Sequence, residues 1–529
     1  MRQTSGQEPP LPRPAGGPER PGPGREGAGP DAADPGTAPG HDGPGRDGPG
    51  RDGPAGGPRR ALVAGGGLAG LLAAAALAPY ADRVTVVERD ALPSGAEPRA
   101  FLPQAQHAHL LWSGGAEAIE GLLPGFTERL LAAGARRIPL TAGMVALSPR
   151  GWYRRWRPTH FLIACTRDLL DRVVRDQVLA LPGVRLLERT QVLGLTGDRE
   201  RITGLRVRTG DEAERTLTAA LVVDATGRGS RTPGWLADLG IPDVAEALVD
   251  SGLVYASRMY RAPSGTEGFP VVNIQAAARG TRPGRSAVIV PVEDGRWLVT
   301  LAGTRGSRPS GDASAFEAFA RSARHPVVAD LLEHAEPLTG VVTFGNTANR
   351  RRYYERARAW PQGLVVIGDA VAGLNPVYGH GMSVAAQGAR ALARELGAGP
   401  AGRELAAPGL ARRVQRAVAR PVSVAWDLAT GQDVFYPGSV GKRPTLADRL
   451  TSRYVERLIL TATGDFRVAT ALTDVITLSA PATALIQPGV LLRALRGPRL
   501  PPLAGPPLTE RELHFTRPTD AGVAETAGT

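Results

Sequence analysis

The chain has 529 residues, enough for two or more lobes with a sizeable core, and a formal net charge of +12. Its 63 basic residues are dispersed and are all Arg except Lys442, so the charge predicts a solvated basic surface and argues against a nucleic-acid partner. Cys165 is the only cysteine, which excludes an intrachain disulfide and a cysteine-based metal site. No apolar run reaches the roughly 18 residues of a membrane-spanning helix, and the N-terminus lacks a signal-peptide pattern, so we expect a cytoplasmic protein without a membrane span.

The N-terminal segment differs in composition from the rest of the chain. Residues 1–58 are mainly Pro, Gly, Asp and Arg, with repeated GRDGP units near residues 45–54. Almost none of these side chains can enter a core, so the segment is predicted to be a disordered tail.

The segment from Ala61 to Asp90 has the order strand, glycine-rich turn, apolar helix, strand, acid. Gly65, Gly67 and Gly70 form G-x-G-x-x-G, and Glu88 ends the second strand. The first glycine permits a tight turn, the second a close approach of the backbone to a pyrophosphate, and the third close packing of helix on strand. The N–H groups that begin the helix face the phosphates, and the acid can accept hydrogen bonds from ribose hydroxyls. The segment therefore predicts a dinucleotide-binding unit.

A polar loop follows from Pro98 and becomes a helix near Trp112. Its polar side chains are Arg99, Gln104, His107 and His109. No acid or third histidine is suitably spaced for a metal site at the two histidines, so a hydrogen-bonding loop is favoured.

Residues 141–165 are predicted to form a hairpin that turns at Pro149–Gly151. The segment is rich in aromatic side chains, namely Trp152, Tyr153, Trp156 and Phe161. Ordinary core packing and the wall of an apolar pocket explain these aromatic residues equally well.

The next helix is expected to begin after Thr166, a suitable N-cap. Arg167 is unfavourable near the positive end of a helix, which suggests another role such as a flavin contact. Residues 184–224 have the pattern of short alternating strands, a meander that returns to the main sheet. Its last strand ends at Asp224 and Gly227, at the sheet edge where ligands of such folds bind.

Residues 250–305 predict a second, substrate-facing sheet, with a hairpin turned at Glu293–Gly295. A buried strand then ends in Asp369, which is placed to hold a polyol. The Pro/Gly loop NPVYGHG leads into a helix that begins near Met382, and the N-terminal N–H groups of this helix can face an anion. Residues 400–515 show amphipathic helix patterns with Pro breaks.

These motifs together resemble the FAD-binding pattern of flavoprotein monooxygenases with the two-domain fold of p-hydroxybenzoate hydroxylase and squalene epoxidase. The motifs are the G-x-G-x-x-G turn, the DATG strand end at 224–227, and the GD pair at 368–369 with its Pro/Gly loop. Within that group the chain looks most like the bacterial epoxidases of polyether ionophore biosynthesis, such as those for monensin and lasalocid. The stretches that carry this resemblance are PQAQHAHLLWSGGAEAIEGLLPG, VVDATGRGSRTPGWL, NRRRYYERARAWPQGLVVIGDA and NPVYGHGMSVAAQ. It runs from about residue 60 to 510 and weakens after 400.

The resemblance implies an α/β fold, with a Rossmann-like FAD-binding domain, a substrate-binding β-sheet domain and a C-terminal helical region. The expected FAD-binding domain is discontinuous and comprises residues 59–140, 166–235 and 340–400. The other expected parts are the substrate-binding sheet domain (141–165 and 236–339), the C-terminal helical region (401–515) and a tail (516–529).

The resemblance also assigns residues to the cofactor. The FAD pyrophosphate would be wrapped by Gly65, Gly67, Leu68, Ala69 and Gly70. The adenosine would be met by Glu88 at the ribose, and by Arg89 and the backbone of Val192 at the adenine. Further FAD contacts would come from Arg99, Gln104, Arg167, Asp224, Gly227 and Asp369, the last at ribityl or pyrophosphate oxygens. The isoalloxazine ring would be lined by Pro376, Gly379, Gly381 and Met382. Two departures from relatives are Phe101 in place of Gly, which affects the loop of Arg99 and Gln104, and His380 in place of Gln.

The implied activity is that of an FAD-dependent epoxidase. In such enzymes reduced FAD takes up O2 as a C4a-hydroperoxide, whose distal oxygen passes to an electron-rich alkene. No protein nucleophile or metal is needed, and no catalytic residue is assigned. The implied substrate is an apolar linear polyene polyketide, epoxidised at one or more E-alkenes in polyether antibiotic biosynthesis. It would lie in a pocket between residues 141–165 and 250–305, with Trp152, Trp156, Phe161 and Trp297 as candidate lining.

Only one dinucleotide fingerprint occurs in the chain. The electron source is therefore expected to be NAD(P)H that docks transiently, or reduced flavin from a separate flavin reductase. The sequence leaves both routes open.

Other activities share these motifs. The main alternative is an FAD-dependent aromatic hydroxylase of the phenol type, followed by a flavin-dependent isoprenoid or polyene reductase. A flavin halogenase is disfavoured because it needs a lysine near the flavin, whereas Lys442 lies in the C-terminal helical region. A serine hydrolase is excluded by the lack of a G-x-S-x-G motif.

Overall fold

The computed structural model describes residues 59–517 except 100–102, 242–243, 278–281 and 399–403. The predicted N-terminal tail, most of the predicted C-terminal tail and Phe101 lie outside the described residues. The α-helices are α1 (Leu68–Leu77), α2 (Ser113–Glu120), α3 (Phe126–Ala132), α4 (Arg167–Leu179), α5 (Thr232–Asp238), α6 (Ala313–Arg321), α7 (Val327–Leu332), α8 (Gly381–Gly397), α9 (Leu410–Asp433), α10 (Leu446–Ala462), α11 (Phe466–Ile476), α12 (Pro488–Arg496) and α13 (Glu510–Leu513).

The strands of the described chain lie between Arg60 and Gly441. They are β1 (Arg60–Ala64), β2 (Arg83–Val87), β3 (Leu111–Trp112), β4 (Arg136–Leu140), β5 (Met144–Ser148), β6 (Gly151–Trp152), β7 (His160–Ala164), β8 (Val184–Leu187), β9 (Thr190–Gly197), β10 (Ile202–Thr209), β11 (Arg215–Thr218), β12 (Leu221–Asp224), β13 (Glu246–Asp250), β14 (Val254–Arg261), β15 (Val271–Ile274), β16 (Arg285–Val292), β17 (Arg296–Gly303), β18 (Glu336–Pro337), β19 (Val342–Phe344), β20 (Asn349–Arg352), β21 (Leu364–Val366), β22 (Ala372–Gly373) and β23 (Val440–Gly441).

A five-stranded parallel sheet in the order β21-β12-β1-β2-β8 carries the glycine-rich turn. In this sheet Ala64 pairs with Asp224, and Asp224 pairs with Val366. Three neighbouring strands therefore end at the same level, and the loops that follow them open at one edge of the sheet.

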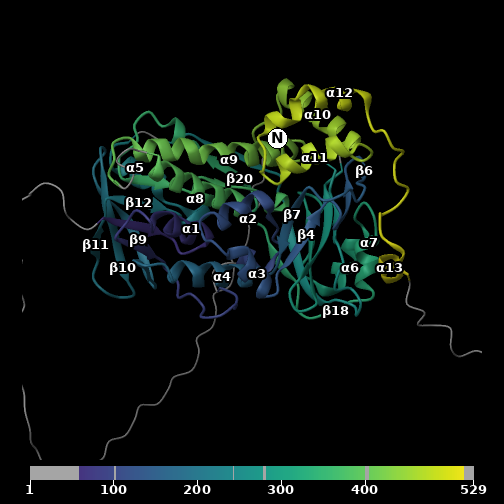
Figure 1. Ribbon diagram of the computed structural model, residues 1–529, viewed down its shortest axis with the longest axis horizontal. Coiled ribbons are helices and arrows are strands. Elements are labelled where there is room, and N and C mark those ends of the chain that lie inside the picture. Colours follow the sequence, from purple (N-terminus) through teal and green to yellow (C-terminus); the bar gives the residue numbers. More distant parts are fainter. Residues whose placement is uncertain (1–58, 100–102, 242–243, 278–281, 399–403, 518–529) are drawn as a thin grey trace, which may run out of the picture. The chain divides into compact units, whose positions relative to one another are not determined.

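Helix α1 is apolar on all sides, and every residue in it except Ala69 is buried. A helix of this kind must be covered all round. It lies on β1 and β2, with α4 and α8 packed against it, and α8 in turn contacts α9 (Figure 1). The first turn of α1 is thereby fixed at the sheet edge where the loops open.

The other side of the parallel sheet is covered by β11, β10 and β9, a three-stranded antiparallel sheet that contacts β12, β1 and β2. The predicted meander that returns to the main sheet is confirmed by β9 to β12. Its first strand, β8, instead extends the edge of the parallel sheet beside β2.

A second sheet of eight strands runs β18-β14-β17-β16-β15-β5-β6, with β19 paired to β14. Its β16–β17 hairpin turns at Glu293–Gly295 as predicted, and Asp294 and Gly295 have φ values of 60° and 62°. The predicted turn at Pro149–Gly151 is also found, because β5 pairs with β6.

Residues 141–165 are nevertheless not a single hairpin, which corrects the sequence interpretation. The β6 arm ends at Trp152, and β7 joins β3 and β4 in a separate three-stranded sheet. The connection between the arms is rich in Arg and contains Pro158, which has no N–H to donate to a ladder, so the second arm cannot continue.

The C-terminal region is mainly helical, as predicted, and α10, α11 and α12 share a hydrophobic cluster. The sequence predicts that prolines interrupt these helices, but Pro421 lies inside α9. The packing of α9 against α8 and β21 outweighs the hydrogen bond that Pro removes. No described helix is both long and apolar enough to cross a membrane.

Candidate functional site

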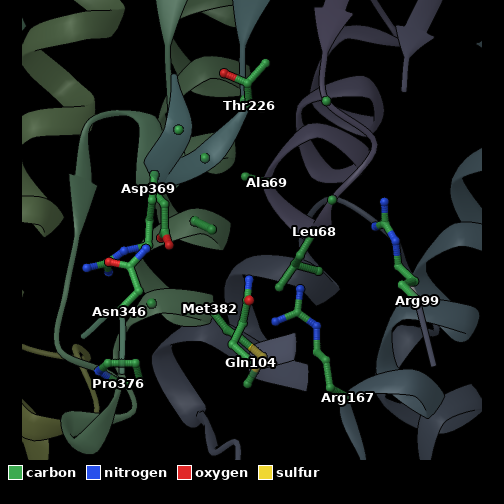
Figure 2. Close-up of a pocket in the computed structure, with 18 of the residues that line it drawn as sticks. Leu68, Ala69, Arg99, Gln104, Arg167, Thr226, Asn346, Asp369, Pro376 and Met382 are labelled. Atoms are coloured by element: carbon green, nitrogen blue, oxygen red, sulfur yellow. The ribbon is translucent and has the colours of Figure 1, made fainter. Parts of the chain in front are cut away.

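A cavity of about 620 Å³ lies where β1, β12 and β21 end (Figure 2). All but two of the cofactor residues predicted from sequence line it. Those that line it are Gly65, Gly67, Leu68, Ala69, Glu88, Arg89, Arg99, Gln104, Arg167, Val192, Gly227, Asp369, Pro376, Gly379, Gly381 and Met382. Figure 2 shows Gln104, Arg167 and Met382 gathered beside Leu68, with Asp369 and Asn346 across from them. Gly70 and Asp224 are the two that the cavity does not touch.

The glycine turn forms one wall of the cavity by bringing backbone very close to backbone. Gly65 has a φ of +99°, and a Cβ atom there would lie 2.6 Å from the carbonyl oxygen of Ala225. A Cβ on Gly70 would lie 1.8 Å from the carbonyl oxygen of Gly65. At Gly67, the N-cap of α1, an added Cβ would meet no neighbouring atom within 4 Å, so this backbone is open. The unpaired N–H groups of the first turn of α1 are thus accessible to an anion.

Glu88 closes the turn from the tip of β2 and is only 5% exposed. Its Oε2 accepts a hydrogen bond from the Gly66 N–H at 2.7 Å, and its Oε1 accepts one from the Asp90 N–H at 3.1 Å. Arg99 pairs with the same carboxylate (Nη2 to Oε2, 3.2 Å) and donates to the Gly66 carbonyl at 3.2 Å. A carboxylate has about four acceptor positions, so Glu88 retains capacity for a ribose hydroxyl.

Two acids follow neighbouring strands but differ in direction. Asp224 is 1% exposed and accepts hydrogen bonds from Thr226, Ser230 and Thr232, which places its side chain inside the loop. Asp369 lines the cavity, where burial raises the pKa of its carboxyl. The positive charge of Arg228 opposes this rise. The structure therefore brings Asp369 to the cavity and leaves Asp224 in a loop-forming role.

The end of the cavity opposite Glu88 is lined by side chains from several distant segments. They include His107, His109, Leu110, Tyr255, Phe344, Asn346 and Leu374. As predicted, the histidine loop is held by hydrogen bonds: His107 Nδ1 lies 2.7 Å from Ser257 Oγ, and His109 Nδ1 lies 2.7 Å from the His107 carbonyl. Burial lowers the pKa of His107 to about 4 and that of His109 to about 3. Both imidazoles are therefore neutral near pH 7.

A buried acid from a distant helix holds the Pro/Gly loop at this end. Asp433 accepts hydrogen bonds from Asn349 Nδ2 (2.7 Å), Asn375 Nδ2 (2.8 Å) and the Tyr378 hydroxyl (2.7 Å). Asn375 in turn accepts a hydrogen bond from the hydroxyl of Tyr255 at 3.2 Å. The last residue of α9 is thereby linked to the cavity wall.

Comparison with known proteins identifies the family. Residues 61–232 match the FAD-dependent oxidoreductase family. Over 393 residues the chain is 32% identical to Protein Rv3254 of Mycobacterium tuberculosis, which covers 72% of this chain and 81% of that protein. The chain belongs to the FAD-dependent oxidoreductases. It is also 29% identical over 344 residues to kynurenine 3-monooxygenase of Salinispora arenicola, covering 62% of this chain and 70% of that enzyme.

Solved structures share the fold of this family member. PqsL of Pseudomonas aeruginosa, described as a probable FAD-dependent monooxygenase, has a TM-score of 0.52 at 19% identity, with 71% of this chain and 96% of that chain covered. The flavin-dependent brominase Bmp2 has a TM-score of 0.57 at 16% identity, with 82% and 98% covered. The predicted α/β fold with an FAD-binding domain is therefore confirmed.

Lys442, the lysine considered for a flavin halogenase, does not line the cavity and pairs with Asp448 at 2.8 Å.

The residues that are present fit FAD, the cofactor of the family. The backbone cradle at Gly65 and Gly70 leaves no space for side chains, and the open first turn of α1 at Gly67 can receive a pyrophosphate. Glu88 and Asp369 would accept hydrogen bonds from ribose and ribityl hydroxyls. The cavity reaches Val192 at one end and Gly379 to Met382 at the other, which are the segments expected for the adenine and the isoalloxazine ring.

The four aromatic residues predicted to line the substrate pocket do not line this cavity. Trp152 and Trp297 lie in the core of the second sheet at 5% and 1% exposure. Trp156 packs on Phe466, and Phe161 lies beneath the guanidinium of Arg137.

The predicted pocket between residues 141–165 and 250–305 is filled by core, which is a further correction. Leu162 and Ala164 of β7 share a hydrophobic cluster with Val271, Val290 and Leu298. Because strand side chains alternate, the inward-facing residues of the two sheets meet there and leave a packed interface.

Sequence reasoning missed Tyr255, Phe344 and Asn346 in the cavity wall, and Asp433 behind it. Tyr255 and Phe344 pair directly across β14 and β19, but they are 89 positions apart in the chain. Asp433 is the last residue of α9. Its position on the apolar face of this helix was the one sign in the sequence that its side chain is buried.

Proposed function

We propose that this protein is an FAD-dependent monooxygenase that epoxidises one or more E-alkenes of a linear polyene polyketide. The main observation behind this proposal is that one cavity is lined both by the glycine-rich turn expected to bind FAD and, at its other end, by the apolar side chains Leu110, Phe344 and Leu374. An apolar chain that enters this end would lie beside the residues expected to line the isoalloxazine ring. The resemblance to polyether epoxidases in the Q-x-x-H-x-H loop and in the NPVYGHG loop supports the same substrate class.

When bound and reduced, FAD supplies the activation of O2 and the transfer of one oxygen atom, while the second oxygen leaves as water. The chain's own residues orient the substrate and the cofactor and exclude water from them. Tyr255 and Phe344 exclude water from the apolar end. The N-terminus of α8 at Gly381 directs its N–H groups and its positive dipole end toward the cavity, which favours negative charge developing on the ring.

The ionisation state of the loop histidines suits an epoxide product. Epoxides open under acid catalysis, and a protonated imidazole beside the product would provide that acid. Because burial lowers the pKa of His107 to about 4 and that of His109 to about 3, neither provides a proton near pH 7. The product would therefore leave the site with its ring intact.

The electron source belongs to the same proposal. The described structure carries one glycine-rich nucleotide turn, which the FAD itself would occupy. NAD(P)H that docks transiently, or reduced flavin delivered by a separate reductase, would complete the cycle in the cytoplasm.

Aromatic hydroxylation is the second candidate, and one observation favours it. The chain is 29% identical to kynurenine 3-monooxygenase, whose name denotes hydroxylation of an aromatic amino acid. The rings of Tyr255 and Phe344 in the cavity wall could stack on such a substrate.

The deciding experiment supplies the full-length holoenzyme with O2 and either NADPH or chemically reduced flavin. One set of reactions contains a linear E-polyene ketone, and the other contains phenolic and anthranilic aromatics. We expect the polyene to gain one oxygen atom per epoxidised alkene by mass spectrometry, with 18O from labelled O2. Oxygen in the aromatic ring alone would favour the hydroxylase, gain of two hydrogens without O2 would favour a reductase, and no oxygen incorporation into either would overturn the monooxygenase.

A matched pair of variants tests whether FAD binding and activity depend on the glycine-rich turn. Gly65→Val should abolish FAD retention and turnover, because its Cβ would meet the Ala225 carbonyl at 2.6 Å. Gly489→Ala, an exposed helical glycine with nothing within 4 Å of the added methyl, should leave both unchanged. Retained FAD in Gly65→Val would contradict the assignment of the turn.

A further inference from the structure

One atom in the wall of the cavity lacks a partner. His107 lines the cavity and is 4% exposed, yet its Nε2 is buried and forms no hydrogen bond with the described part of the chain. Its ring packs against Tyr255 and Phe344, with centroids 5.6 Å and 5.9 Å away. A buried polar atom in such apolar surroundings is costly unless a ligand pairs with it.

The other ring nitrogen of His107 determines what Nε2 can offer. The Ala108 N–H donates to Thr300 Oγ1 at 2.9 Å, Thr300 Oγ1 lies 2.6 Å from Ser257 Oγ, and Ser257 Oγ lies 2.7 Å from His107 Nδ1. Each hydroxyl proton has an acceptor when Thr300 donates to Ser257 and Ser257 donates to Nδ1. In the reverse direction the Thr300 proton would have no acceptor within the described residues. The proton of the neutral imidazole is therefore on Nε2, which is a donor.

His109, two residues later, has the opposite arrangement. Its Nδ1 lies 2.7 Å from the carbonyl oxygen of His107, and a carbonyl can only accept. In the neutral ring Nδ1 therefore carries the proton, and Nε2 is an acceptor. The same loop, whose two histidines line the cavity, thus carries one donor, His107 Nε2, and one acceptor, His109 Nε2.

We propose that the Nε2–H of His107 binds an uncharged oxygen of the substrate, a ketone carbonyl or a hydroxyl, and so fixes which alkene of a long apolar chain lies beside the flavin. This inference rests on the proposed function and adds the chemical group by which the substrate is held. In an apolar compartment every stretch of a polyene packs about equally well, so register must come from a polar contact. A neutral donor beside two aromatic rings offers that contact without the charge that would select a carboxylate.

The test measures binding alone, with oxidised holoenzyme and no reductant. The probes are two linear polyenes that differ only in a ketone carbonyl replaced by CH2, and the readout is perturbation of the flavin absorption spectrum. We expect wild-type protein to bind the ketone more tightly. His107→Phe, which keeps a flat ring against Tyr255 and Phe344, should weaken ketone binding on the order of tenfold and leave hydrocarbon binding unchanged.

Two further variants separate recognition from damage to the fold. Ser257→Ala keeps the imidazole but removes its orienting partner, so we expect a loss of about threefold for the ketone alone. Ser286→Ala, a buried serine on β16 that does not line the cavity, should alter neither affinity. FAD content is measured for each variant to establish folding.

The outcomes distinguish this inference from the proposed function. Equal affinity of wild-type protein for both probes, or equal losses for both in His107→Phe, would overturn the role of His107. No binding of either probe to wild-type protein would overturn the polyene as substrate. A retained ketone preference without oxygen transfer in the turnover assay would refute the epoxidase and leave the His107 contact standing.

Discussion

Asp224 and Asp369 occupy equivalent places in the fold and serve different purposes. Asp224 ends β12, Asp369 comes shortly after the neighbouring edge strand β21, and both are predicted from sequence to contact the cofactor. Asp224 is 1% exposed, and its two oxygens are taken up by Thr226, Ser230 and Thr232. Asp369 lines the cavity and accepts no hydrogen bond from the described side chains. Position at a strand end is therefore not sufficient to assign a ligand-binding acid.

The difference follows from the residues that come next. Asp224 is followed by the hydroxyl residues of DATGRGSRT, which fold back onto the carboxylate, whereas Asp369 is followed by the apolar AVAG. Hydroxyl side chains close to an acid readily satisfy it locally. An acid without such neighbours stays available to a ligand.

The largest expected effect is on stability, in Asp224→Ala. Removing this carboxylate leaves the buried hydroxyls of Ser230 and Thr232 without their acceptor, so we expect the free energy of unfolding of the apoprotein to fall by about 3 kcal/mol. Urea denaturation followed by circular dichroism measures it. Asp238→Ala, an exposed acid on α5, is the control and should change little. Unchanged stability with weakened FAD binding would reverse the assignment of Asp224.

Asp433→Ala extends the comparison to a third acid. Asp433 is the last residue of α9 and is buried behind the end of the cavity where the isoalloxazine ring is expected. The substitution would leave Asn349, Asn375 and Tyr378 without their acceptor. Burial raises the pKa of this carboxyl. The cost of burying its charge therefore offsets part of the stability that its hydrogen bonds contribute. We expect a loss of about 2 kcal/mol in stability, together with a shifted flavin absorption spectrum.

The spectrum distinguishes an effect on the loop from general destabilisation. Arg420→Ala, an exposed position on the same helix, should leave both stability and spectrum as they are. A stability loss with an unaltered flavin spectrum would mean that Asp433 does not shape the ring end of the cavity.

Asp369→Ala should show the opposite pattern from Asp224→Ala. We expect FAD affinity to fall about tenfold, because a hydrogen-bond acceptor for the cofactor is lost, while apoprotein stability stays the same or rises. Titration with FAD, followed by quenching of flavin fluorescence, gives the affinity. Destabilisation as large as in Asp224→Ala would place Asp369 among the structural acids.

The smallest effect is the pH dependence of apoprotein stability in Asp369→Asn. Burial raises the pKa of Asp369, so the unfolded chain loses this proton at a lower pH than the folded chain, and stability falls as pH rises through that interval. The variant lacks this loss. Its stability should exceed that of the wild type near pH 7, and the difference should vanish as the pH falls below the ordinary pKa of an unfolded aspartate, about 4. A difference that grows on acidification would contradict the raised pKa.

What could be predicted from the sequence depended on how local each feature is. The turn at Gly65 to Gly70, Glu88 and the loop at Pro376 to Met382 come from short segments whose backbone pattern carries the chemistry, and all of the residues predicted there except Gly70 line the cavity. The apolar end could not be predicted, because Tyr255 and Phe344 meet only through strand pairing. Residue type alone does not distinguish Trp152 and Trp297 from residues that line a pocket. Only the packing of the second sheet shows that they belong to the core.

The order of strands in the parallel sheet has a consequence for how the protein is made. The sheet places β1, from residues 60–64, two strands away from β21, from residues 364–366, and the cavity is completed by residues up to Ala385. During synthesis the glycine turn leaves the ribosome some three hundred residues before the loop that faces it. Such distant pairings form slowly, and the nascent N-terminal half exposes the apolar α1 until α8 arrives to cover it. We therefore expect FAD to bind only after most of the chain has been made.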